Sequence, residues 1–265
     1  MPKCFAASPS ATVSGIDLIT APSSATPSTR RWGLLHALVG VGIFALCILG
    51  PSLLPAEWVS YPVWLAIVFA LPVLVTAWIV VVSRRWGTGD LIRDYGLSFR
   101  WIDLLGIPAA FAAIWFIQPV VVYLALLMFG DPGGLDSNVF VTPEPAIWVP
   151  SLILSVIAAP FIEEVVFRGM LQPSLKRWFD GPDPDQIRSF RATNAAVLIT
   201  AATFAALHLP QSLAGVNGVA LTAATLFAGI VLGALAMATR RTAPSIVVHA
   251  ASNLVANATA YGLVA

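Results

Sequence analysis

Two adjacent acids and an arginine lie within an apolar stretch, in the sequence Phe161-Ile-Glu-Glu-Val-Val-Phe-Arg-Gly169. On a helix Glu164 and Arg168 are four residues apart and can neutralise each other, whereas Glu163 projects about 100° away on another face. A charge within a membrane segment costs about 2.5 kcal/mol or more, and such a residue usually faces a polar cavity. We therefore predict that Glu163 is a functional acid. A purely structural ion pair is the alternative for Glu164 and Arg168.

Two later apolar segments carry polar side chains at a spacing of four residues. Phe204-Ala-Ala-Leu-His208 places an aromatic ring one turn from an imidazole, and His249-Ala-Ala-Ser-Asn253 places an imidazole and an amide on one helix face. A lone buried histidine is most often a packing residue. Acid, imidazole and amide groups from three separate apolar segments favour a shared functional site instead.

The composition indicates that these segments lie in a membrane. Hydrophobic residues make up 58% of the 265 residues and charged residues 10%, with a mean hydropathy of +0.86. About a quarter of the residues of a soluble domain are charged. We predict an all-α, polytopic transmembrane helical bundle in the cell membrane. Its helices would contact the lipid bilayer. The net charge of +1 gives no indication of nucleic-acid binding.

Seven apolar runs are each near the ~20 residues that cross the hydrocarbon core. Pro160 is one of several prolines within or beside them, and membrane helices tolerate such prolines where neighbouring groups satisfy the freed carbonyls. The runs predict about seven helices, at roughly 32–54, 61–82, 103–129, 146–170, 192–209, 217–238 and 243–264.

Basic residues predict the orientation of these helices, because Lys and Arg concentrate in cytoplasmic loops. Alternate loops contain them and the intervening loops contain none. We therefore expect the N-terminus in the cytoplasm and the C-terminus outside. The cytoplasmic set is Lys3, Arg30 and Arg31, then Arg84, Arg85, Arg93 and Arg100, then Lys176, Arg177, Arg188 and Arg191, and finally Arg240 and Arg241.

Counting residues along the fourth and fifth predicted helices gives the depth of each candidate residue. These depths agree only under one condition. Glu163 and His208 come out roughly 22 and 28 Å from the turn between these helices, but His249 lies only ~12 Å beyond Arg241. The three meet if the hairpin of helices four and five projects into the cytoplasm. The site would then open to the cytoplasm.

The whole chain divides into three predicted parts. Residues 1–29 are rich in Ser, Thr, Ala and Pro and predict a disordered cytoplasmic tail, residues 30–94 the N-terminal transmembrane helices, and residues 95–265 a catalytic membrane domain. Cys4 and Cys47 are badly placed to pair, so we expect no structural disulfide. The sequence shows no internal repeat, so an inverted-repeat transporter is not favoured.

Three motifs, each complete, on separate apolar helices and in the same order, carry a resemblance to a known family. E-E-x-x-x-R, F-x-x-x-H and H-x-x-x-N together resemble the CPBP family of intramembrane proteases, also called the Abi or CAAX prenyl protease type II family, over about residues 95–260. The resemblance implies a four-helix catalytic core around a hydrophilic cavity and proteolysis of membrane-associated substrates. It implies that Glu163 is the catalytic acid, supported by Glu164 and Arg168.

The remaining roles follow from the same resemblance and agree with peptide hydrolysis, which needs an activated water, a proton donor and an oxyanion site. His208 would help Glu163 to hold the water, and His249 and Asn253 would stabilise the oxyanion. Glu163, His208 and His249 could instead ligate a catalytic zinc ion. The sequence leaves both mechanisms open, one with zinc and one without a cofactor.

We therefore predict a peptidase that cuts membrane-tethered or lipidated substrates, prenylated CAAX-type proteins among them. One alternative is a non-proteolytic membrane scaffold or bacteriocin self-immunity protein that keeps the polar cluster for stability. Another is a small transporter or proton relay, because intramembrane Glu and His also mark ion pathways.

Overall fold

The computed structural model describes residues 32–50, 61–129, 149, 151–213 and 218–261, and these residues form helices and no strand. The predicted tail, 1–29, lies outside them. The N-terminal helices are α1 (Leu34–Leu49) and α2 (Tyr61–Trp86), followed by the short α3 (Leu91–Tyr95). Each of the seven predicted spans overlaps a helix in this described part of the chain. The prediction of an all-α membrane bundle is therefore confirmed.

The third span is one long rod made of α4 (Asp103–Ala112), the π-helix η3 (Ala113–Ile117) and α5 (Gln118–Phe129). Only 6% of the most apolar 18-residue stretch of this rod is buried, so the rod presents most of its apolar surface outward. Among the described residues, three helices are long and apolar enough to cross a membrane: Asp103–Phe129, Gln186–Leu209 and Gly218–Thr239. The outward apolar surfaces of the rod are what a lipid environment requires.

A second composite rod carries the glutamates. It consists of the π-helix η4 (Leu154–Ala158), α7 (Ala159–Glu164), the π-helix η5 (Val165–Leu171) and α8 (Gln172–Asp180). Gly181, at φ 69°, ends α8, as expected of a glycine at a helix C-terminus. Side chains of η5 are fully buried and form the centre of the main apolar core with Phe44 of α1 and Val75 of α2.

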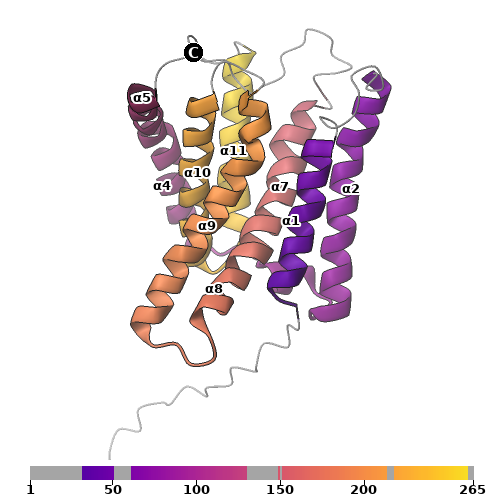
Figure 1. Cartoon of the computed structure of the whole chain (residues 1–265), viewed down its shortest axis with the longest axis vertical. Helices are drawn as coiled ribbons and strands as arrows, with labels where there is room; N and C mark the ends of the chain where they lie inside the picture. The colour runs from indigo at the N-terminus through magenta and orange to yellow at the C-terminus, as the bar shows by residue number, and fades with distance from the viewer. Residues whose placement is uncertain (1–31, 51–60, 130–148, 150, 214–217, 262–265) are drawn as a thin grey trace, which may run out of the picture.

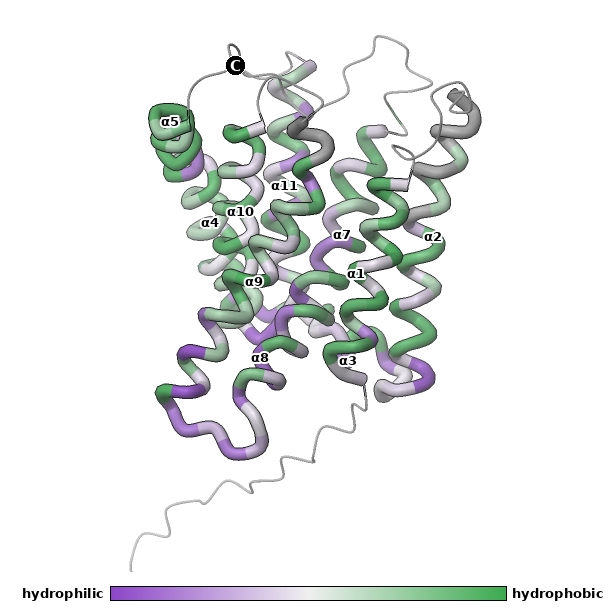
Figure 2. The backbone as a smooth tube through the Cα atoms, in the orientation of Figure 1, coloured by the Kyte–Doolittle hydropathy of each residue, from purple (hydrophilic) through white to green (hydrophobic). Residues whose placement is uncertain are grey.

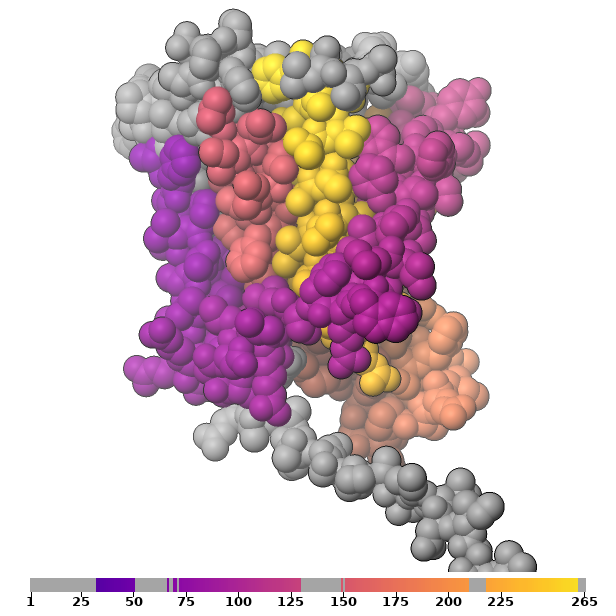
Figure 3. Space-filling view, turned by 180° about the vertical axis from the view of Figure 1, so that it is seen from behind, coloured from indigo at the N-terminus to yellow at the C-terminus, as the bar shows by residue number. Residues whose placement is uncertain are grey.

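Three helices complete the bundle: α9 (Gln186–Leu213), α10 (Gly218–Thr239) and α11 (Ala243–Ala260). The composite rod and α11 lie side by side, flanked by α2 and by the α4–α5 rod (Figure 3). Figure 1 shows the α8–α9 hairpin extending beyond the ends of α10 and α11, as the depth count required. Hydrophilic residues gather on this hairpin and at α7, within an otherwise hydrophobic bundle (Figure 2).

Candidate active site

The Glu164 carboxylate and the Arg168 guanidinium form a buried ion pair on the composite rod. Arg168 Nη1 lies 3.1 Å from Glu164 Oε1, and both side chains have zero exposure. Arg168 Nη2 also donates to the carbonyl of Gly229 on α10 at 3.4 Å, and its guanidinium carbon lies 4.7 Å from the centre of the Phe204 ring on α9. Buried charges persist only with such compensation, so this pair fixes the rod against its neighbours.

His249 of α11 lies between the two glutamates. Its Nδ1 is 2.9 Å from Glu164 Oε1, and its Nε2 is 3.7 Å from Glu163 Oε2. A carboxylate beside an arginine accepts hydrogen bonds, so Nδ1 carries the hydrogen that it donates to Glu164. Glu164 thereby fixes the orientation of the ring and directs Nε2 toward Glu163.

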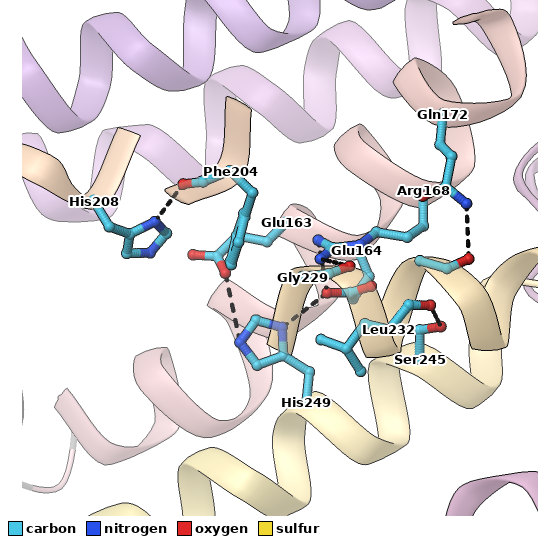
Figure 4. Close-up of polar contacts among 11 residues, drawn as sticks. Glu163, Glu164, Arg168, Gln172, Phe204, His208, Gly229, Leu232, Ser245 and His249 are labelled. Carbon is cyan, nitrogen blue, oxygen red and sulfur yellow. Dashed lines mark hydrogen bonds and ion pairs between the residues drawn. The ribbon is translucent and has the colours of Figure 1, made fainter. Parts of the chain in front are cut away.

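Glu163 differs from its neighbour in exposure, because its side chain keeps 12% of its surface accessible whereas Glu164 keeps none. The 3.7 Å to His249 Nε2 is longer than a direct hydrogen bond, and a water molecule can bridge such a gap. In Figure 4 the Glu163 carboxylate points toward the side on which both His208 and His249 lie. A carboxylate in this position can accept a hydrogen bond from a water molecule.

His208 contacts the same cluster through Phe204. Its Nδ1 lies 2.8 Å from the Phe204 carbonyl oxygen, so Nδ1 carries a hydrogen and the neutral ring has its lone pair at Nε2. The Phe204 ring centre is 4.5 Å from that of His208 and 6.1 Å from that of His249. One aromatic ring thus contacts both imidazoles and the Arg168 guanidinium.

Asn253 lies one turn after His249 and donates from Nδ2 to the Ser155 carbonyl at 2.8 Å. Ser155 belongs to η4, in which the backbone pairs residues five apart, and the residue five positions later is Pro160, which has no N–H. The Asn253 amide compensates for that missing donor. It has a second hydrogen that can serve a substrate oxygen.

Two backbone carbonyls of α10 receive side chains from the composite rod at matching intervals. Arg168 donates to Gly229, and Gln172, four residues later, donates from Nε2 to the Gly233 carbonyl at 2.9 Å. A Cβ on Gly233 would lie 2.7 Å from Gln172 Oε1, so a larger residue there would force the Gln172 side chain to shift. The signal in the sequence is Gly229-x-x-x-Gly233, a spacing typical of close helix packing in membranes. This glycine pair was not among the residues predicted from the sequence.

All six candidate residues come from α7, η5, α9 and α11, and α10 supplies the Gly229 carbonyl. The composite rod, α9, α10 and α11 therefore all contribute groups to this cluster. Within the described residues, however, no three His, Cys, Asp or Glu side chains lie close enough together to hold a metal ion. Glu163, His208 and His249 therefore do not form a ready three-ligand zinc site in this conformation.

Residues 145–255 match the family model described as Type II CAAX prenyl endopeptidase Rce1-like. The matched segment is less than half of the 265 residues, but it contains every candidate site residue. The match confirms the predicted resemblance to the CPBP family over this segment. No curated protein and no solved structure matches the chain.

Proposed function

We propose that this protein is an intramembrane endopeptidase that hydrolyses a peptide bond in membrane-associated substrates, with prenylated CAAX-type proteins as the leading class. One observation carries the proposal. An accessible glutamate lies 3.7 Å from an imidazole that a buried Glu164–Arg168 pair holds in place, within a segment similar to type II CAAX prenyl endopeptidases.

In the proposed reaction Glu163 is the general base. A water between Glu163 and His249 gives a proton to the carboxylate, and its oxygen attacks the carbonyl carbon of the scissile bond. Glu163 then returns the proton to the leaving amine as the carbon–nitrogen bond breaks. The products are a new carboxylate and a new amine, so the reaction consumes one water and needs no other reactant.

The negative oxygen of the tetrahedral intermediate needs hydrogen-bond donors. We assign this role to His249 Nε2, in the doubly protonated form of the ring, and to the second amide hydrogen of Asn253. His208 would help to hold the water from α9. Glu164 and Arg168 touch no reacting atom in this scheme and act by orienting His249.

We also propose that the N-terminus lies in the cytoplasm. The basic residues of the predicted cytoplasmic loops that the structure describes lie at the end of α2 and around α3, on the α8–α9 hairpin and in the α10–α11 turn. Figure 1 places the end of α2, the hairpin and the α10–α11 turn at the same end of the bundle. Lys and Arg concentrate on the cytoplasmic side of membrane proteins. The projecting hairpin would then lie in the cytoplasm, and the site would be reached from that side.

The test is cleavage of synthetic C-terminal peptides, with and without a prenylated cysteine, by the purified full-length protein in detergent. Mass spectrometry of the products locates the bond that is cut. We expect wild type to cleave, and Glu163→Ala, His208→Ala and His249→Ala to lose cleavage while still folding. The same cleavage reactions with a chelator added measure any metal requirement.

Two results would contradict the proposal. One is undiminished cleavage by Glu163→Ala. The other is a folded wild type that cleaves no peptide of either kind, which would favour the scaffold or immunity reading. Movement of protons or solute in liposomes without cleavage would favour a transporter instead.

A further inference from the structure

The helix that carries His249 begins at a corner of the fold remote from the proposed catalytic groups. The backbone N–H groups of Thr242 and Ala243, where α11 starts, both donate to the Gly96 carbonyl, at 2.8 and 3.3 Å. Beside them the Arg241 guanidinium forms an ion pair with the Asp103 carboxylate at the start of α4. The start of α11 is therefore tied to the α3–α4 segment by backbone and side-chain contacts together.

The Asp103 end of this ion pair is itself rigidly held. Its side chain has zero exposure, and that of Arg241 has 10%. The second carboxylate oxygen of Asp103 accepts from the Arg100 N–H at 2.7 Å, and the Asp103 N–H donates to the Arg100 carbonyl at 2.9 Å. A buried ion pair contributes little net stability, so a role in fixing geometry is the better reason for its presence.

The same corner also contacts the rod that carries the glutamates. Gly96 is in the left-handed conformation, with φ 68°, and a Cβ there would lie 3.2 Å from the Arg241 Cα. Across the corner, a Cβ on Gly169 would lie 3.3 Å from the Tyr95 Cβ and 3.6 Å from the Thr242 hydroxyl. The α3 segment is thus wedged between the rod and the start of α11.

We propose that Asp103 and Arg241, with the Gly96 carbonyl, are positioning groups that place His249 against Glu163 and Glu164. His249 follows Arg241 by about two helical turns, or ~12 Å, and α11 transmits any shift of its first turn over that length. The Asn253 hydrogen bond to Ser155 holds α11 on the other side of His249. The catalytic part of this inference rests on the proposed function, and the positional part does not.

Asp103→Asn tests the inference because it keeps the size of the side chain and removes its charge. We expect kcat to fall at least about tenfold with KM unchanged, since displacements near 1 Å are costly in catalysis. The matched control is Asp180→Asn, which also removes the charge of an acid in an ion pair. Asp180 pairs with Lys176, whose ammonium also donates to Ser189 Oγ at 3.0 Å, so this pair ties α8 to α9 on the projecting hairpin. That control should lower the melting temperature with little change in kcat.

A second readout is independent of peptidase activity. The chain has three histidines, so a sample labelled with nitrogen-15 in histidine gives few imidazole signals, and His249→Gln assigns the relevant one. Asp103→Asn should shift the His249 signals and leave those of His36 on α1 unchanged. Arg241→Lys, which keeps the charge but loses the planar donor group, should give a smaller shift of the same signals and serves if Asp103→Asn does not fold.

The outcomes separate the two proposals. A shift of the His249 signals in a protein that cleaves no peptide would sustain the positioning inference and count against the proposed function. His249 signals and kcat that match wild type in folded Asp103→Asn or Arg241→Lys would overturn the inference. An equal His249 shift in Asp180→Asn would also overturn it, because the effect would then be general to the loss of any paired acid.

Discussion

Glu163 and Glu164 are neighbours in the chain, but they lie in two different environments. Glu164 is fully buried and compensated by Arg168 and His249, whereas Glu163 keeps 12% of its side chain accessible and has an imidazole nitrogen 3.7 Å away. Two adjacent residues of one helix can therefore differ both in burial and in the groups that compensate their charges. In the proposed mechanism the buried acid orients His249, and its more accessible neighbour acts on the water.

The largest expected effect is on activity at the accessible acid. Glu163→Gln keeps the size of the side chain and removes the base, so we expect kcat to fall by at least about 10³-fold, within the range ascribed to general acid–base catalysis. The melting temperature in detergent should stay near that of wild type. A variant that cleaves at a comparable rate would show that the accessible glutamate is not the base.

Glu164→Gln should instead affect stability first. The substitution leaves the Arg168 charge buried and uncompensated, which costs about 3 kcal/mol or more when a buried pair is broken. We expect a clear drop in the melting temperature, together with a loss of activity as His249 loses its anchor. Equal melting temperatures for the Glu163 and Glu164 variants would remove the distinction between the two acids.

Phe204→Leu tests how much the aromatic ring over the Arg168 guanidinium stabilises the buried ion pair of Glu164 and Arg168. It removes the ring over the Arg168 guanidinium but keeps the backbone carbonyl that contacts His208, so we expect a loss of about 1 kcal/mol beyond packing. The control is Phe44→Leu, which removes a buried ring that contacts Phe167 edge-on. Thermal unfolding of both should show the larger loss at Phe204. Equal losses would mean that the contact with Arg168 contributes nothing.

The smallest effect tests whether stability and activity separate. Arg240 has φ 56° in the turn between α10 and α11, a conformation that costs a non-glycine residue about 1 kcal/mol. Arg240→Gly should relieve this strain and raise the melting temperature slightly, with kcat unchanged. A lower melting temperature would show that the arginine side chain contributes more than its backbone strain costs.

The helices and the candidate residues could be predicted from the sequence, because apolar runs of spanning length and polar groups at intervals of four have simple physical meanings. The projection of the α8–α9 hairpin also followed from counting residues along it. Whether the three motifs carry out the proposed chemistry stays a prediction.

The backbone partners could not be predicted. Arg168, Asn253 and the start of α11 use the carbonyls of Gly229, Ser155 and Gly96, and any residue type offers a carbonyl. The Asp103–Arg241 pair joins residues 138 positions apart, so no local spacing in the sequence relates them. Such contacts depend on how the helices pack, which local spacing does not encode.

In the proposed mechanism Glu163 and His249 act as one unit on one water. A double-mutant cycle tests it most directly, with kcat/KM measured for wild type, Glu163→Gln, His249→Gln and the double variant on the best peptide. Residues that act as a unit are strongly non-additive. We expect the double variant to be about as slow as the slower single variant. A double loss equal to the product of the two single losses would show that Glu163 and His249 act independently.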